Sequence, residues 1–339
     1  MMITFHRSSS LGALEFCEMK YFFQYVLGKK DKTNKRAVLG TIFHRAMQVL
    51  ADKKIAQRDK KKKLENDDIC DMTFAECDDI DHITEVCFNY YKEHEKDVDL
   101  TPSDLKTCIK WVYKAIAYND GALDPRNQDV YATELFFDFQ IKKPWAKYHY
   151  EIQGKVFEGY LGIKGTVDLI VFETEDYFQI LDYKTGKRLN WATDKPKEYE
   201  DLQNDKQLLL YYYALKNEFP DKEFYVSIYY VNDGGVFDFA FGDEEYEKAE
   251  KMLRSRFEYI RSVGTPKQLS PQQKHWKCQK LCKFSEFDKK AGKSTCNVFH
   301  DMIKSKGIHY VTEKYADVNK FGTYGDGGGR IAEQDTGTD

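Results

Sequence analysis

Long apolar runs are absent from this sequence of 339 residues. No stretch of about 18 apolar residues occurs, so the sequence predicts no transmembrane helix, and its first residues do not form the apolar core of a signal peptide. We therefore expect an intracellular, cytoplasmic protein with no membrane partner. An excess of positive charge is absent as well, because 52 lysines and arginines stand against 56 aspartates and glutamates. A net charge of −4 means that any phosphate-bearing partner must meet local clusters of cations.

Several functional motifs are also missing. The sequence has no Gly-x-x-x-x-Gly-Lys-Ser/Thr motif, so we expect no ATP-driven unwinding by this chain alone. No helix-turn-helix or zinc-finger module is evident, which argues against sequence-specific reading of bases. What the sequence does contain is 42% hydrophobic and 15% aromatic residues. That content supports a core for one large domain or two modest ones.

Helical and strand patterns are mixed along the chain, which predicts an α/β sandwich with a central mixed sheet flanked by helices. The expected helices cover residues 8–27, 40–54, 82–96, 103–118, 199–217 and 243–262. The expected strands cover residues 131–139, 148–160, 165–173, 177–184, 223–231 and 237–241.

Two carboxylates and one lysine occur at hairpin spacing near the middle of the chain. Asp168 lies in an alternating run that is followed by a turn signal at Glu175-Asp176, and Asp182 and Lys184 lie in the next run. Strand alternation places Asp182 and Lys184 on the same face. If the two runs pair as a hairpin, the three side chains converge at one end of a sheet. Such a set suits a hard divalent cation and a polarised water.

These residues resemble the PD-(D/E)XK nuclease superfamily, specifically its RecB-type branch. There Gly-x-x-Asp precedes a short hairpin and the sequence Asp-Tyr-Lys-Thr-Gly, and residues 165–168 and 182–186 match this pattern. Residues 40–44 (Gly-Thr-Ile-Phe-His) resemble the upstream histidine motif of the branch. Residues 207–215 resemble its downstream Gln-x-x-x-Tyr-x-x-Ala-Leu helix. The resemblance extends over about residues 8–300 and implies a restriction-endonuclease-like fold.

The resemblance also implies a role for each matching residue. Asp168 and Asp182 would bind Mg²⁺ or Mn²⁺ together with His44 and the backbone carbonyl of Tyr183. The imidazole ligand makes a preference for manganese conceivable. Lys184 would orient the attacking water and stabilise the developing charge. Asp168, Asp182 and Lys184 are therefore the expected catalytic residues.

Five further residues have weaker expected roles. Gln207 and Tyr211 would contact the substrate or support the metal site. Lys187 and Arg188, just beyond the strand that carries Lys184, would contact phosphates. Glu134 stands at the position of an acidic residue in some relatives, but a glutamate in an edge strand is usually solvated. The role expected for Glu134, as a second metal ligand or a residue that supports the metal site, is therefore the weakest of the five.

Four of the eight cysteines have an informative layout. Cys17 lies near the N-terminus, and Cys278, Cys282 and Cys296 lie near the C-terminus. This layout resembles that of iron–sulfur members of the RecB-type branch, among them AddAB-type and CRISPR-associated nucleases. The resemblance implies that the four thiolates hold a structural 4Fe–4S cluster. The chain departs from the family pattern at Glu18, where proline is usual, and in the longer gap between the last two cysteines.

A structural zinc ion is the alternative. Cys278, Cys282, Cys296 and His300 form Cys-x3-Cys-x13-Cys-x3-His, which suits tetrahedral zinc. Zinc leaves Cys17 without a role, so the iron–sulfur cluster is favoured.

Four regions are expected along the chain. They are an N-terminal helical region (1–125, with a lysine-rich insertion at about 51–80), a nuclease core (126–265), a cysteine-rich metal-cluster segment (266–316) and a disordered glycine-rich tail (317–339). Lysine clusters within residues 29–32 and 60–63 are further candidates for phosphate contacts, and the second is better explained as a solvated insertion.

The expected function is divalent-metal-dependent hydrolysis of DNA by an exonuclease. The substrate would be single-stranded or end-frayed DNA, supplied by a helicase or recombination partner during DNA repair or recombination. Three alternatives stay open: a catalytically silent scaffold or nucleic-acid-binding subunit, a metal-cluster interaction protein with a coincidental core motif, and an RNA-directed nuclease. The run Tyr211-Tyr212-Tyr213 would suit stacking on single-stranded bases of either polymer.

Overall fold

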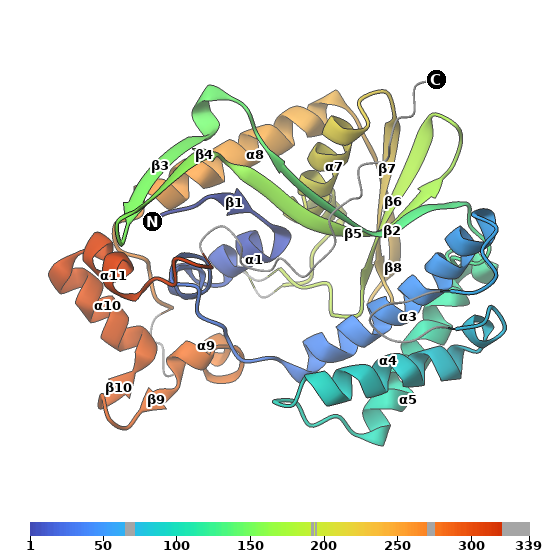
Figure 1. The fold of residues 1–339 in the computed structure, drawn as a ribbon, viewed down its shortest axis with the longest axis horizontal. Helices are drawn as coiled ribbons and strands as arrows, with labels where there is room; N and C mark the ends of the chain where they lie inside the picture. The colour runs from blue at the N-terminus through green and yellow to red at the C-terminus, as the bar shows by residue number, and fades with distance from the viewer. Residues whose placement is uncertain (65–71, 191–192, 194, 270–274, 321–339) are drawn as a thin grey trace.

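The computed structural model describes residues 1–64, 72–190, 193, 195–269 and 275–320. At its centre is a six-stranded mixed sheet of strand order β1-β5-β6-β7-β8, with β2 paired to β5. Helices lie on both sides of this sheet (Figure 1). The expected α/β architecture, a central mixed sheet flanked by helices, is therefore confirmed. None of the helices in the described part of the chain has the length and apolar content needed to cross a membrane.

The sheet contains the predicted central hairpin. Its strands are β1 (Phe5–His6), β2 (Val130–Gln140), β5 (Gly162–Phe172), β6 (Tyr177–Lys184), β7 (Glu223–Tyr230) and β8 (Gly235–Phe241). Strand β5 pairs antiparallel with β2 and with β6, whereas β6 and β7 run parallel. Pairing of β5 with β6 ends at Leu169 opposite Leu181. Asp168 and Asp182 therefore follow the last pair, at the same end of the hairpin.

Two hydrophobic cores fill the two faces of the sheet. On one face, Leu169 and Leu181 pack with apolar residues of α3, α4 and α5. On the other face, Ile170 and Ile180 pack with α1, α7 and α8. The helices are α3 (Lys35–Arg58), α4 (Ile80–His94), α5 (Pro102–Ile116), α1 (Ser8–Phe16), α7 (Lys206–Glu218) and α8 (Asp243–Ser262). Burying each of these branched side chains contributes roughly 1.5–3 kcal/mol.

Two expected helices are each divided in the structure. The helix expected over residues 8–27 is broken at Cys17, whose extended backbone (φ −173°, ψ 128°) separates α1 from α2 (Glu18–Tyr21) and a π-helical turn (Phe22–Val26). The helix expected over residues 199–217 is broken between α6 (Tyr199–Gln203) and α7. There Asp205 caps α7 by accepting a hydrogen bond from the Gln207 backbone.

The prediction of a single strand over residues 148–160 is wrong. The structure has a separate hairpin of β3 (Lys147–Ile152) and β4 (Lys155–Tyr160), joined at Gln153-Gly154. Both turn residues adopt positive φ, 52° and 71°, as tight hairpin turns require. Helix α3 also extends to Arg58, into the expected insertion. Residues 65–71 of that insertion and all of the expected tail beyond residue 320 lie outside the described residues.

The C-terminal segment packs beside the N-terminal helices. It contains α9 (Trp276–Leu281), β9 (Phe287–Asp288), β10 (Lys293–Ser294), α10 (Thr295–Lys306) and α11 (Ile308–Tyr315). Short 3-10 turns occupy Glu76–Asp78, Tyr118–Gly121, Pro144–Ala146 and Lys283–Ser285. Figure 1 shows this segment on the opposite side of α1 from α4 and α5. The two ends of the described chain thus meet next to the sheet.

Gly165 allows the close approach of β2 to β5. It lies opposite Phe137, and a Cβ atom at this position would lie 2.4 Å from Phe137 Cζ. We predict that Gly165→Ala destabilises the fold by about 1–3 kcal/mol through overpacking, measured as the shift of the urea unfolding midpoint. Gly264→Ala is the matched control, because a Cβ atom there meets nothing within 4 Å. Equal stability of the two variants would contradict this explanation of the glycine.

Candidate active site

Three carboxylates lie in a row across three neighbouring strands. Pairs on either side of Glu134 and Asp168 (Thr133 with Leu169, Leu135 with Val167) place these two acids opposite each other on β2 and β5. Continuing the β5–β6 register past its last pair likewise places Asp168 beside Asp182. Side chains of directly opposed residues in antiparallel strands are close neighbours. The sheet itself therefore concentrates negative charge at this point.

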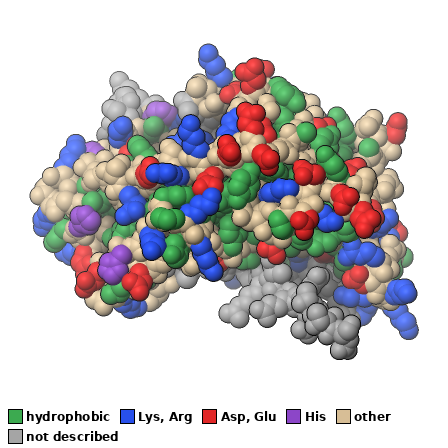
Figure 2. All heavy atoms as spheres, turned by 90° about the horizontal axis from the view of Figure 1, so that it is seen from above, with side chains coloured by type: hydrophobic (Ala, Val, Ile, Leu, Met, Phe, Trp, Pro, Cys, Tyr) green, Lys and Arg blue, Asp and Glu red, His purple; other side chains and the backbone are tan. Residues whose placement is uncertain are grey.

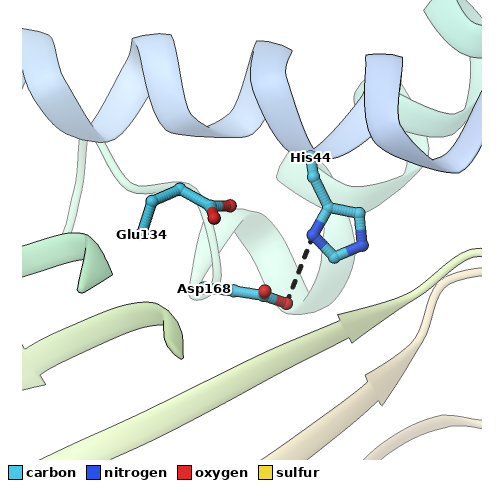
Figure 3. A group of neighbouring side chains, drawn as sticks. All are labelled: His44, Glu134 and Asp168. Carbon is cyan, nitrogen blue, oxygen red and sulfur yellow. Dashed lines mark ion pairs between the residues drawn. The ribbon is translucent and has the colours of Figure 1, made fainter. Parts of the chain in front are cut away.

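A metal-binding group is formed where α3 crosses this row. One ligand atom from each of His44, Glu134 and Asp168 lies within 4.8 Å of the other two. Figure 3 shows His44 descending from α3 onto Asp168, with Glu134 approaching from the side. His44 Nδ1 lies 3.3 Å from Asp168 Oδ2, and the same oxygen accepts a 2.7 Å hydrogen bond from the Tyr183 backbone N–H. Two carboxylates and an imidazole suit Mn²⁺ or Mg²⁺ as donors.

The charges of His44 and Asp168 support each other. Burial opposes charging of both groups, but the nearby carboxylate and its hydrogen bond outweigh burial and raise the pKa of His44. For Asp168 burial is likewise outweighed, mainly by His44 and also by Lys184, so its pKa is lowered. Asp168 is therefore the carboxylate of the row that is most readily ionised and available as a metal ligand.

Glu134 is a residue to which the sequence interpretation gave only a weak role. Burial, followed by the charge of Asp168, raises the pKa of Glu134 to about 8. Its backbone adopts φ 46° inside a strand, a costly conformation that clusters at functional sites. A carboxyl that is neutral in this setting can ionise when a cation arrives. The antiparallel register of β2 against β5 is the signal that would have identified it.

Asp182 and Lys184 are joined by Gln207. Lys184 Nζ lies 2.5 Å from Asp182 Oδ2 and donates to Gln207 Oε1 at 3.0 Å. Gln207 Nε2 donates to Asp182 Oδ1 at 2.7 Å and to the Tyr211 hydroxyl at 2.5 Å. The amide thus holds the carboxylate and the ammonium in one fixed arrangement. Its position on the first turn of α7 is set by the Asp205 cap.

In the ion pair between Asp182 and Lys184, the carboxylate is buried and the ammonium is accessible. The Asp182 side chain is 1% exposed, whereas that of Lys184 is 31% exposed. Burial raises the pKa of Asp182 to about 6 despite the opposing effect of Lys184. For Lys184, burial is outweighed by Asp182 and Asp168, and the pKa is raised. The ammonium therefore stays charged, and it can reach a molecule outside the protein.

A cleft of about 590 Å³ leads to this ammonium. Lys184 at the end of β6 and Gln207 on α7 line it, together with Ser8, Leu11 and other residues of α1. Lys187 also lines the cleft, as its expected phosphate contact requires. The volume lies within the roughly 300–1,000 Å³ that is common for ligand clefts.

Other sequence-predicted residues are placed differently. The Arg188 guanidinium stacks 5.1 Å from the ring centroid of Phe237. Tyr211, Tyr212 and Tyr213 are all buried in the core, so their expected stacking on bases is wrong. Tyr211 instead acts on the site through its hydrogen bond with Gln207.

The four cysteines of the expected cluster, Cys17, Cys278, Cys282 and Cys296, lie in the region where the two ends of the chain meet. Cys17 Sγ donates to the Lys267 carbonyl at 3.6 Å, and Gln268 Nε2 donates to Cys296 Sγ at 3.2 Å. Burial, followed by the charges of Cys282 and Cys17, raises the pKa of Cys278 to about 11. Among the described residues these sulfurs do not form a group of three within 4.8 Å.

That spacing bears on the choice of metal. Zinc–sulfur bonds of about 2.3 Å place tetrahedral ligands roughly 3.8 Å apart. The described arrangement of Cys278, Cys282, Cys296 and His300 does not provide such a group. The thiols and the imidazole at this junction are donor types that structural zinc sites use, and thiolates are also the ligands of iron–sulfur clusters.

Comparison with known proteins gives one family match. The model of the PD-(D/E)XK nuclease superfamily matches residues 8–287. No curated protein matches this sequence. The crystal structure of a "putative exonuclease" from Eubacterium rectale is similar with a TM-score of 0.45 and 11% identity, covering 81% of this chain and 87% of that one. The structure of a protein named SSO0001 gives a TM-score of 0.24 and 13% identity over 65% of this chain and 84% of that one. Both scores are too low to carry an argument about function.

Glu134 provides a test of the metal-binding group. We predict that Glu134→Gln weakens Mn²⁺ binding by about 10- to 100-fold, as loss of a ligand or supporting partner does at other metal sites. Isothermal titration calorimetry of the metal-stripped protein measures this change. Glu151→Gln, on the exposed face of β3, is the charge-matched control. Identical affinities for both variants would exclude Glu134 from the site.

Proposed function

Because the chain belongs to the PD-(D/E)XK nuclease superfamily, we propose that it is a divalent-metal-dependent nuclease with Asp168, Asp182 and Lys184 as its catalytic residues. The observation that carries the proposal is the meeting of these three side chains at one end of the β5–β6 hairpin, where the Lys184 ammonium lines a cleft. A family fold without such a site would support a scaffold equally well.

Mg²⁺ or Mn²⁺ would be held by Asp168, Asp182 and His44, with the backbone carbonyl of Tyr183 and with Glu134 as an added acidic group. When bound, the ion supplies positive charge that polarises the scissile phosphoryl group. The grouping of buried carboxyl groups supports this assignment. Burial, and to a smaller extent the charge of Asp168, raises the pKa of Glu134 and of Asp182, and a bound cation would favour their ionised forms.

Lys184 would act on the attacking water. Its ammonium is fixed by Asp182 and Gln207 and opens to the cleft. From this position it would orient the water by hydrogen bonding and stabilise the negative charge that develops on the phosphoryl oxygens. Gln207 would act as a positioning residue, because its amide fixes the ammonium. Lys187 would contact the substrate backbone.

The proposed substrate is single-stranded or end-frayed DNA, and the proposed mode is exonucleolytic. The cleft is lined by residues of α1, by Lys184 and Lys187, and by residues in and around α6 and α7, and the choice of a single strand rests on the resemblance to exonucleases of the RecB-type branch. The sequence has no motif for ATP-driven unwinding, so a helicase or recombination partner would supply the strand. DNA repair or recombination inside the cell is the proposed setting.

We further propose that Cys17, Cys278, Cys282 and Cys296 hold a structural 4Fe–4S cluster, which would place the chain in the RecB-type branch. The convergence of both chain ends at these cysteines supports it. A cluster there would fix α1, one wall of the cleft, to the C-terminal segment.

The nuclease activity is tested with linear DNA labelled separately at each end. We predict that Mg²⁺ or Mn²⁺ supports release of label by the unmodified chain, that chelator abolishes it, and that Asp182→Asn and Lys184→Ala each lower the rate by about a hundredfold or more. Gln207→Ala is expected to lower the rate by about tenfold to a hundredfold through loss of alignment. The order in which the two labels are lost gives the polarity.

The matched control for these variants is Lys187→Ala, which is expected to weaken substrate binding more than the chemical step. Parallel substrates of single-stranded DNA, duplex DNA and RNA separate the nuclease alternatives. Absence of cleavage of all three by the folded, metal-loaded protein would contradict the enzyme assignment and favour a silent scaffold.

The metal at the cysteines is tested by elemental analysis of two variants. An iron–sulfur cluster predicts that Cys17→Ser loses bound iron and visible absorption, whereas His300→Ala keeps both. A zinc site predicts the reverse, with zinc retained in Cys17→Ser and lost in His300→Ala. A chain with neither metal after anaerobic purification would exclude both sites.

A further inference from the structure

Positive charge is concentrated in one part of this acidic protein. Between residues 275 and 306 there are eight lysines and three acidic residues, although the whole chain has a net charge of −4. On the face shown in Figure 2, basic and acidic side chains are interspersed. The lysines of α9, the β9–β10 hairpin and α10 therefore form a local cationic segment of the kind that phosphate contacts require.

A second lysine cluster packs against this segment. Asp31 accepts a hydrogen bond from the Lys283 backbone N–H at 2.8 Å and pairs with Lys20 at 2.8 Å. Lys29 Nζ lies 5.7 Å from the ring centroid of Phe299 on α10. The lysines of residues 29–32 thus add to the same surface, although about 250 residues of sequence separate the two clusters.

Exposed aromatic rings accompany these cations. Phe287 on β9 is 67% exposed and Trp276 on α9 is 37% exposed. Phe287 lines a cavity of about 300 Å³, together with the polar residues Gln279, Lys293 and Asn297. Exposure of the apolar Phe287 ring to water is unfavourable, and packing within the fold does not offset it. The ring suits stacking on a base whose backbone meets the cations.

The cationic segment is connected to the cleft by α1. This nine-residue helix lines the cleft with Ser8, Leu11 and Glu15. It ends at Cys17, whose thiol contacts Lys267. Lys20, in the next helix, donates to the Leu281 carbonyl of α9 at 3.2 Å. A helix of this length spans about 14 Å, so the residues of α1 that line the cleft lie within that distance of the break at Cys17.

We propose that the surface formed by residues 29–32 and 275–306 binds single-stranded nucleic acid that extends from the active-site cleft, with Phe287 stacking on a base. This inference rests on the proposed nuclease function and adds a second contact for the same strand. The lysines bind the backbone without regard to sequence, and the ring accepts any base. The surface would hold the substrate while its end lies in the cleft.

The test is a binding measurement that needs no cleavage. Fluorescence anisotropy is recorded for Lys184→Ala protein without added divalent cation, using single-stranded DNA of about 4 and about 16 nucleotides. In that background, Lys289→Gln/Lys290→Gln is expected to weaken binding of the longer strand several-fold. It should also reduce the slope of log affinity against log salt by about 1.4. The shorter strand, which fits the cleft, should be unaffected.

Phe287→Ala is expected to weaken binding of the longer strand about tenfold with little change in the salt slope, and Phe287→Trp should restore it. Lys61→Gln/Lys62→Gln is the charge-matched control from exposed lysines beyond α3. This control should bind the longer strand with the same affinity as the Lys184→Ala parent protein.

Two results would overturn the proposal. The first is an unchanged affinity for the longer strand in both Lys289→Gln/Lys290→Gln and Phe287→Ala, compared with the parent protein. That result would favour an acidic protein as the partner of this surface. The second is an equal loss in the Lys61→Gln/Lys62→Gln control, which would reduce the effect to net charge. If the variants change strand binding as predicted but the unmodified chain cleaves no substrate, the proposed nuclease function is contradicted and the proposed binding surface is not.

Discussion

The buried charge at the end of the β5–β6 hairpin is the constraint on which the site depends. Asp182 is 1% exposed, and an isolated carboxylate at such depth is costly. The ion pair with Lys184 and the hydrogen bond from Gln207 offset the cost of burying the Asp182 carboxylate. The same contacts fix the Lys184 ammonium at the cleft. The sheet then adds Asp168 and Glu134 in register, which brings three carboxyl groups together at one point. The proposed divalent cation would add positive charge beside these carboxyl groups, at a position that the strand pairing determines.

The second constraint is the junction of the two chain ends. Helix α1 lines the cleft, and the residues that follow it contact the C-terminal segment through Lys20 and Asp31. The cysteines, the lysines and the exposed aromatic rings all belong to this junction. Substrate binding, metal content and the position of α1 are therefore expected to be coupled, although the catalytic carboxylates lie on the sheet.

The central hairpin and its acids could be predicted from sequence because alternation, turn residues and motif spacing all agreed there. Glu134 was given too little weight because its position beside Asp168 depends on the register of β2 against β5, which no single strand reveals. The break at Cys17 was missed because a single extended residue leaves the helical pattern on both sides intact. Gln207 was expected near the site, but its bridging of Asp182 and Lys184 requires the fold of α7 over the sheet. The tyrosine run was misinterpreted because composition does not distinguish a buried aromatic from an exposed one.

The central claim is that the carboxylate row is built for a cation, and the most direct measurement is the stability of metal-stripped protein as a function of Mn²⁺ concentration. A ligand that binds only the folded state stabilises it by about 2.7 kcal/mol at a hundred times its dissociation constant. The account predicts that the urea unfolding midpoint of the unmodified chain rises with Mn²⁺, and that Asp168→Asn removes this dependence. A midpoint that does not respond to Mn²⁺, or that responds equally in Asp168→Asn, would contradict it.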